Sequence, residues 1–270
     1  MLAALLLPVL VTGDAQPPAN AVSLMEPRVQ YRPNVASATS SPWVDANGWK
    51  IIRSPGRTFV YRVKGEATGL AAAESFAYGA ASFIFADAPG AVSFAKMLAF
   101  LKTIPAVDLS PVADFGVIDD GSDLTGETLN LLTRMNLLYK LEKNPDRGFR
   151  VNVQLGMKEY PKEDARNPSI LAHKIRSQIG DDHRSLRVYG SEIVIGRLLD
   201  GPGQGRVFLL NYGKPTLGLR VRVMGAYPKG ESRVFGLAAA KLVDWTQDGQ
   251  ATEFTIPELR TLAVIDLSKK

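Results

Sequence analysis

The sequence predicts an α/β protein with an open, mainly parallel sheet flanked by helices, followed by a small antiparallel β-sandwich. Two observations support this prediction. Between about residues 57 and 180, strand-like and helix-like segments alternate, which is typical of successive βα units. In the last third of the chain, apolar and polar residues alternate between Gly and Pro breaks, which is typical of antiparallel strands.

The α/β part is expected to consist of successive βα units. Strands are expected at Arg57–Val63, Ala81–Ala86, Val112–Ile118 and Arg150–Leu155, and helices at Gly69–Tyr78, Ala91–Lys102, Leu124–Leu141 and from Pro168 to Gly180. Ser122 or Asp123 is the expected N-cap of the longest helix, and Asn167 is the N-cap of the last one. A complete eight-fold barrel needs about 250 residues. An open sheet therefore fits this segment better, and half a barrel is the alternative.

The sandwich is expected to occupy the C-terminal part of the chain. Its strands are expected at Ile193–Leu199, Arg206–Tyr212, Leu217–Tyr227, Ala251–Leu259 and Arg260–Leu267. The glycine-rich segment Asp200–Gly205 separates the first two strands and predicts a hairpin turn. It does not fit a phosphate-binding loop, because no Lys-Ser/Thr pair follows it and a strand, not a helix, comes next.

Composition narrows the classes of function. The chain has 270 residues, of which 46% are hydrophobic and 22% charged, as in ordinary globular proteins. The net charge of +5 is spread along the chain, which argues against nucleic-acid binding. The absence of cysteine excludes disulfides, thiolate metal sites and a cysteine nucleophile. His173 and His183 form no H-E-x-x-H pair or three-ligand set, so neither a metal site nor a cofactor is predicted.

The N-terminus predicts export. Leu2–Val11 is an apolar run of the length found in secretory signal peptides, and cleavage is expected after Ala15 or Ala21. The pattern lacks its usual basic start, since the first basic residue is Arg28. The run is too short to cross a bilayer as a helix, so no membrane span is expected. The expected location is the periplasm or the exterior of the cell.

These patterns divide the chain into four segments. Residues 1–21 are the expected signal peptide, and residues 22–42, rich in Pro, Ala, Ser and Asn, are the expected linker. The α/β domain is expected at 43–183 and the C-terminal β-sandwich at 184–270.

The order of segments LLNYG, RVRV, ATEFTIPEL and LAVIDL resembles the β-sandwich that closes many bacterial glycoside hydrolases, the β-galactosidase-like ones among them. The segment FGVIDDGSDLTGETLNLLTRMNLLYKL is similar to the glutamine-amidotransferase-like domain that precedes the sandwich in those enzymes. The resemblance covers roughly residues 110–267. It implies a role in carbohydrate metabolism, and self-association into a homo-oligomer through the amidotransferase-like domain.

The same resemblance implies an accessory protein and not the hydrolase itself. The catalytic glutamates of the β-galactosidase-like enzymes stand on the strands of a barrel, and no such barrel is matched in this chain. The absence of cysteine also removes the Cys-His-Glu triad of true amidotransferases, which agrees with a non-catalytic domain.

A cluster of acids is the first candidate for catalysis. Asp119 and Asp120 follow a predicted parallel strand and precede a helix that carries Glu127. Ligands of open α/β sheets gather at the carboxyl ends of strands, and two carboxylates about 5–10 Å apart suffice for glycoside hydrolysis. Adjacent strand residues point to opposite faces, so Glu127 would have to approach one of the two aspartates. The alternative is that these residues only turn the chain and cap the helix.

A second candidate site combines aromatic and polar side chains. Trp43, Asp45, Asn47 and Trp49 offer apolar faces and hydrogen-bonding groups, the two features that bind sugars. The alternative is a pair of tryptophans packed under a domain edge, with a turn between them.

The sequence thus favours an exported, non-catalytic accessory protein of carbohydrate metabolism that binds carbohydrate or mediates assembly. Two alternatives stay open. One is a glycoside hydrolase with a carboxylate pair near Asp120 and Glu127, and the other is a structural envelope protein that binds another protein.

Overall fold

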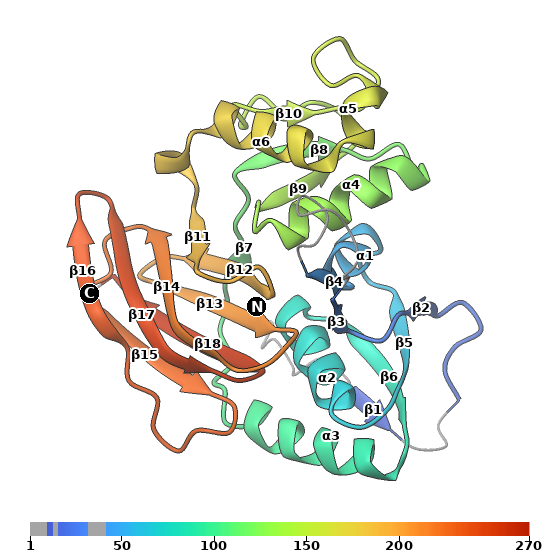
Figure 1. Cartoon of the computed structure of the whole chain (residues 1–270), viewed down its shortest axis with the longest axis vertical. Helices are drawn as coiled ribbons and strands as arrows, with labels where there is room; N and C mark the ends of the chain where they lie inside the picture. The colour runs from blue at the N-terminus through green and yellow to red at the C-terminus, as the bar shows by residue number, and fades with distance from the viewer. Residues whose placement is uncertain (1–9, 13–15, 32–41, 270) are drawn as a thin grey trace.

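The computed structural model of the chain describes residues 10–12, 16–31 and 42–269. They form two small α/β units and a β-sandwich. Figure 1 shows the second α/β unit at the top, the sandwich at the lower left and the first α/β unit at the lower right. The predicted fold class, parallel sheets with helices followed by an antiparallel sandwich, is confirmed. The parallel strands are, however, divided between two sheets.

The first α/β unit is built on a four-stranded parallel sheet in the order β1-β6-β5-β2. Its elements are β1 (Leu10–Thr12), β2 (Val22–Leu24), α1 (Gly48–Arg53), β5 (Thr58–Val63), α2 (Ala67–Tyr78), β6 (Ala81–Ala86) and α3 (Ala88–Leu101). A separate antiparallel ribbon pairs β3 (Arg28–Gln30) with β4 (Trp43–Asp45).

Helix α2 lies between the first sheet and the sandwich. Its small alanine side chains allow close packing, and nearly all of its residues are buried. Phe76 packs edge to face on Phe208 of the sandwich, with ring centroids 6.0 Å apart. Gly79 ends the helix in the left-handed conformation, with φ of 67°, which glycine adopts without strain. Tyr78 is therefore held at a sharply defined helix end.

The second α/β unit contains a three-stranded parallel sheet in the order β10-β8-β9. Its elements are β8 (Phe115–Ile118), α4 (Asp123–Arg134), β9 (Tyr139–Glu142), β10 (Asn152–Val153), α5 (Lys162–Arg166), α6 (Pro168–Ile179) and the short 3-10 helix Asp181–His183. Its own core includes Phe115, Leu129 and Leu171, and Trp49 and Ile52 of α1 pack against that core. Helix α1 therefore links the two α/β units.

The helix predicted over Leu124–Leu141 is wrong in its C-terminal part, because α4 ends at Arg134 and a strand follows. Asn136 has φ of 54°, a left-handed conformation that ends a helix and that asparagine tolerates. Its side chain pairs with strand β12 (Val194–Gly201) of the sandwich: Nδ2 donates to the Val194 carbonyl at 3.0 Å, and Oδ1 accepts from Gly196 N–H at 2.6 Å. This tertiary contact overrides the helical spacing of the leucines.

The sandwich consists of two antiparallel sheets, in the orders β11-β14-β17-β16 and β15-β18-β13-β12-β7. The remaining strands are β7 (Ser110–Pro111), β11 (Leu186–Tyr189), β13 (Gln204–Asn211), β14 (Thr216–Met224), β15 (Lys229–Val234), β16 (Val243–Asp248), β17 (Ala251–Leu259) and β18 (Leu262–Ser268). The predicted hairpin at residues 200–205 is confirmed as the connection between β12 and β13.

The five-stranded sheet is buried on both faces. Val207 and Ile265 face the other sheet of the sandwich, whereas Phe208 and Val264 face the first α/β unit. A strand buried on both faces has a nearly continuous apolar sequence, as β13 does. The first unit and the sandwich therefore share one core.

Two described segments lie in regions that the sequence assigns to a signal peptide and a linker. Strand β1 pairs with β6, and β2 pairs with β5. The rest of the predicted signal peptide up to Ala15 lies outside the described residues, and the domain boundaries stay predictions. Within the described part of the chain, no helix is both long and apolar enough to cross a membrane.

Candidate functional site

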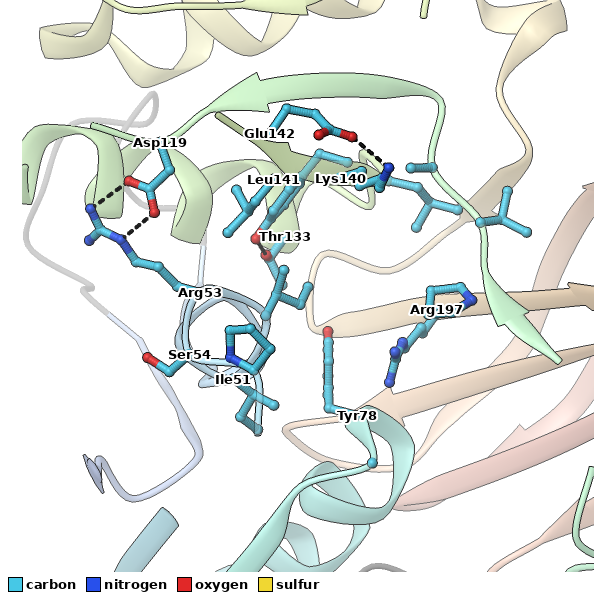
Figure 2. A pocket seen from close by; sticks show the side chains of 18 of the residues that line it. Ile51, Arg53, Ser54, Tyr78, Asp119, Thr133, Lys140, Leu141, Glu142 and Arg197 are labelled. Atoms are coloured by element: carbon cyan, nitrogen blue, oxygen red, sulfur yellow. Dashed lines mark hydrogen bonds and ion pairs between the residues drawn. The ribbon is translucent and has the colours of Figure 1, made fainter. Parts of the chain in front are cut away.

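A cleft of about 1610 Å³ lies where the two α/β units and the sandwich meet. One wall is formed by α1, the turn after it and the amino ends of β5 and β6. The opposite wall is formed by the carboxyl end of β8, by β9 and by the loop after β9, and β12 contributes Gly196 and Arg197. Figure 2 shows some of the side chains that line this cleft.

Asp119, the first predicted acid, lines the cleft but is held by an arginine. Arg53 donates from Nε and Nη2 to the two carboxylate oxygens of Asp119, each at 2.8 Å (Figure 2), and Nη2 also donates to the Ser122 carbonyl at 2.8 Å. The hydrogen bond and charge of Asp119 raise the pKa of Arg53. This bidentate pair joins α1 to the second α/β unit across the cleft wall.

Asp120 is exposed and caps helix α4. Its Oδ1 accepts from Ser122 Oγ at 2.7 Å, from Thr125 Oγ1 at 2.7 Å and from Ser122 N–H at 3.0 Å. These hydrogen bonds lower the pKa of Asp120 to about 2. Ser122 is the N-cap residue, as predicted, and accepts from Thr125 N–H at 3.2 Å. A carboxyl with this pKa is ionised at neutral pH and is unsuited to donate a proton.

Glu127 is an exposed residue of α4 that does not line the cleft. It is two residues beyond Thr125, which faces Asp120, and two residues correspond to about 200° around a helix. Glu127 forms no hydrogen bond with Asp119 or Asp120 among the described contacts. The structure therefore brings Asp119 and Asp120 to one turn and leaves Glu127 on another face of the helix.

In the second predicted site, Asp45 and Asn47 are buried and bonded within the chain. Asp45 Oδ2 accepts from Arg28 Nε at 3.0 Å and from Gln30 Nε2 at 2.5 Å, which closes the β3–β4 ribbon. Asn47 bonds both backbone groups of Met25, each at 3.0 Å. Their hydrogen-bonding groups are therefore engaged in holding the N-terminal segment.

The two tryptophans lie outside the cleft. The guanidinium carbon of Arg134 lies 3.9 Å from the ring centroid of Trp43. Trp49 packs against Gly126 of α4, where an added Cβ would be 3.1 Å from Trp49 Cζ3. Trp49 thus has the domain-edge packing of the alternative interpretation, and the carbohydrate contact of these four residues stays a prediction.

Glu74 is a buried carboxyl that sequence patterns do not single out, and it positions α1 beside the cleft. Glu74 of α2 is fully buried and accepts from Tyr212 Oη at 2.6 Å, Asn47 N–H at 2.7 Å, Tyr61 Oη at 2.8 Å and Asn47 Nδ2 at 2.9 Å. Burial raises the pKa of Glu74, and these donors oppose the rise. The sequence signal was a lone glutamate within an alanine-rich apolar helix.

Arg197 of β12 is a second side chain of the cleft that sequence patterns do not single out. It lines the cleft, donates from Nη1 to the Ala77 carbonyl at the end of α2, and lies over Tyr78 with its guanidinium carbon 4.9 Å from the ring centroid. Among the described residues it forms no ion pair. Burial lowers its pKa. The sequence signal was a single arginine between the apolar residues Ile195 and Leu198.

The cleft as a whole is basic, with six basic and three acidic residues in its lining. The basic residues are Arg53, Arg57, Lys140, Lys143, Arg147 and Arg197, and the acidic ones are Asp119, Glu142 and Asp146. Glu142 pairs with Lys140 at 2.6 Å. His173 and His183 lie elsewhere, and no group of three or more His, Cys, Asp or Glu residues in the described ranges is placed to hold a metal ion.

Comparison with known proteins places this fold beside glycoside hydrolases. No protein-family model and no curated protein matches the sequence. Among solved structures, α-L-fucosidase isoenzyme 2 from Paenibacillus thiaminolyticus is similar with a TM-score of 0.61 and 9% identity, over 80% of this chain and 61% of that chain. The chain thus covers less than two thirds of that enzyme's length.

Two further matches are looser. The apo exo-carrageenase GH42 from Bacteroides ovatus has a TM-score of 0.43 and 9% identity, over 84% of this chain and 45% of that chain. The cold-adapted β-galactosidase from Rahnella sp. R3 has a TM-score of 0.40 and 8% identity, over 90% of this chain and 53% of that chain. At 9% identity, the likeness to the α-L-fucosidase concerns the fold alone. The chain therefore has the fold of part of a glycoside hydrolase, as the sequence resemblance predicts.

Proposed function

We propose that this chain is an exported, non-catalytic accessory protein of carbohydrate metabolism that binds a saccharide in the cleft between its α/β units and its sandwich. The observation that carries this proposal is the cleft itself, about 1610 Å³ in volume and lined by both polar and apolar side chains. Sites for small ligands usually measure about 300–1,000 Å³, so this cleft has room for an oligosaccharide. The fold likeness to part of an α-L-fucosidase supports the choice of a saccharide as ligand.

The state of the predicted acids supports a binding role over hydrolysis. Glycoside hydrolysis needs one carboxyl that is protonated before it acts and a second that is ionised. The pKa of Asp120 is lowered to about 2, both oxygens of Asp119 are held by Arg53, and Glu127 lies outside the cleft. The alternative, a hydrolase with Asp120 and Glu127 as its carboxylate pair, is tested by measuring turnover of a panel of chromogenic glycosides.

Export and self-association are parts of the proposal that rest on the sequence. The apolar run Leu2–Val11 supports export, and the resemblance to amidotransferase-like domains supports a homo-oligomer. Fractionation of cells that express the full chain tests export, and light scattering during gel filtration tests the oligomeric state. A cytoplasmic location or a monomer would remove the corresponding part and leave the cleft proposal standing.

Binding in the cleft is tested by filling it. Ser54 lines the cleft at the turn after α1, and its side chain forms no hydrogen bond among the described contacts. Ser54→Trp should therefore obstruct the cleft and abolish saccharide binding in isothermal titration calorimetry. Val92→Trp is the matched control, since Val92 is 56% exposed on α3 and lies outside the cleft. Equal binding by wild type, Ser54→Trp and Val92→Trp would refute the proposal.

A further inference from the structure

We infer that the saccharide bound in the cleft carries an anionic group, a carboxylate or a sulfate ester, and that Arg197 binds this group. The inference rests on the proposed function, because it names the class of ligand that the same cleft takes. Arg197 is the one basic residue that the sandwich contributes to the cleft lining.

Most hydrogen-bond donors of Arg197 are not used by the described contacts. A guanidinium carries five N–H donors in a planar fork and remains charged in proteins. The described contacts use one nitrogen, Nη1, which donates to the Ala77 carbonyl. The only other described contact is with the face of Tyr78, and no carboxylate of the described residues pairs with Arg197. A partly buried cation without a counter-charge is stabilised by an anion that enters the cleft.

The position of the guanidinium is fixed before any ligand binds. Tyr78 is held at the sharply defined end of α2, and its ring meets the backbone of Gly48, where an added Cβ would lie 2.1 Å from Tyr78 Cζ. Arg197 lies over that ring and is tied to the adjacent carbonyl of Ala77, and Figure 2 shows the two side chains next to each other at the cleft. A guanidinium group that is already held in position loses little conformational entropy when it binds a planar carboxylate or a sulfate.

The charges around Arg197 add to the attraction. Arg53 and Lys140 are neutralised by Asp119 and Glu142. Arg57, Lys143 and Arg147 form no ion pair among the described residues, and of the acids in the lining only Asp146 is left to balance them. Unpaired cations in a cleft raise the local concentration of anions, and this effect weakens as salt is added.

A purely structural role for Arg197 is the competing explanation. Cations at the C-terminus of a helix bind its free carbonyls and interact favourably with the helix dipole. This role accounts for the hydrogen bond to Ala77 and leaves the remaining donors unexplained. The two explanations differ in one measurable respect, since only the first makes binding depend on the charge of the ligand.

The test uses one disaccharide in three forms, neutral, with one uronate group and with one sulfate ester, and adds sodium sulfate alone as a fourth probe. Calorimetric titrations would compare the wild type with Arg197→Gln, Arg197→Lys and Arg62→Gln. Arg62 is the matched control, because it is exposed on β5, lies 4.6 Å from the ring centroid of Phe85 and is outside the cleft. Arg197→Lys keeps the charge and a donor for Ala77 but lacks the planar fork. Circular dichroism and thermal unfolding would confirm that each variant is folded.

We expect the wild type to bind at least one charged form about tenfold or more tightly than the neutral form, the effect of one charge-assisted hydrogen bond. Arg197→Gln should remove this preference and leave the neutral form unchanged, Arg197→Lys should retain part of it, and Arg62→Gln should retain all of it. The preference should shrink as the salt concentration rises.

The outcomes separate this inference from the proposed function. Equal binding of neutral and charged forms by the wild type would overturn the anionic ligand and leave saccharide binding intact. A preference for a charged form that survives in Arg197→Gln would overturn the role of Arg197 as the residue that binds the anionic group. Binding of sulfate alone that depends on Arg197, without binding of any saccharide, would overturn the proposed function and the saccharide part of the inference. No binding of any probe would overturn both.

Discussion

Replacing Tyr212 by phenylalanine tests the buried hydrogen bonds to Glu74, which position α1 in the cleft wall. Tyr212 Oη donates to Glu74 Oε1 at 2.6 Å, and both side chains are buried. Phenylalanine keeps the ring and removes only the donor, so no sizeable cavity is left. Hydrogen bonds to charged groups contribute about 1.5–3 kcal/mol. Tyr212→Phe should therefore lower the free energy of unfolding by about 1.5–3 kcal/mol, measured by urea denaturation at neutral pH.

Tyr139→Phe is the matched control for this substitution. The Tyr139 hydroxyl is also buried, but its bond at 3.0 Å is to the neutral hydroxyl of Thr133. A neutral hydrogen bond contributes about 0.5–1.5 kcal/mol, so Tyr139→Phe should cost less than Tyr212→Phe. Equal costs for the two variants, or a smaller cost for Tyr212→Phe, would refute the reasoning that Glu74 is a charged acceptor.

The pH dependence of stability provides an independent check on Glu74. Burial raises the pKa of Glu74 in the folded protein, so the folded state holds this proton to a higher pH than the unfolded chain does. The resulting stabilisation is complete below the unfolded-state pKa of about 4.3 and is lost as the pH rises through the folded-state pKa, by at most about 1.4 kcal/mol per pH unit. Glu74→Gln does not titrate and should flatten this part of the profile. An unchanged slope in Glu74→Gln would contradict the assignment.

Three further substitutions test the neighbourhood of the cleft. Gly48→Ala places a Cβ 2.1 Å from Tyr78 Cζ, so it should lower the free energy of unfolding by about 1–3 kcal/mol. It should also weaken the binding of charged saccharides, because it displaces Tyr78 and Arg197. A variant with the melting temperature and affinity of the wild type would contradict this. Asp120→Asn should leave the response to a panel of chromogenic glycosides unchanged. It should lower the free energy of unfolding by about 1 kcal/mol or less, because the hydrogen bonds that lower the pKa of Asp120 are exposed to solvent. Turnover by the wild type that Asp120→Asn abolishes would establish the hydrolase alternative. Trp49→Ala should destabilise the contact with α4 and leave saccharide affinity unchanged, whereas loss of binding in a folded Trp49→Ala protein would move the saccharide site to the Trp43–Trp49 segment.

The regular elements of the fold follow from local sequence. The pattern ASFIFA predicts β6 with its observed bounds, and Asn167-Pro168 marks the start of α6 through its capping chemistry. The glycine-rich segment before Gln204 predicts the hairpin of the sandwich. In each case the signal is contained in a few consecutive residues.

The predictions that the structure corrects depend on contacts between distant segments. The end of α4 is set by Asn136, whose side chain is bonded to the backbone of β12 some sixty positions later in the chain. The division of the parallel strands into two sheets likewise depends on which strands pair, and local periodicity does not encode pairing.

The candidate site was only partly predictable for the same reason. Asp119 is predictable from the sequence because ligands of open α/β sheets gather at the carboxyl ends of strands, and it does line the cleft. Arg197 and Tyr78 are far apart in the sequence and belong to different parts of the fold. They meet only because β12 passes the end of α2. A lone arginine in an apolar strand was the only sequence signal for this pair.

Mapping a bound ligand on the protein would show whether the cleft is a saccharide site in which Arg197 binds the anionic group. Amide chemical shifts would be followed by NMR while a uronate-bearing disaccharide is added. We expect changes at Ser54, Tyr78, Gly196 and Arg197, all of which line the cleft. Changes confined to Trp43–Trp49 or to the outer strands of the sandwich, or no changes at all, would contradict it.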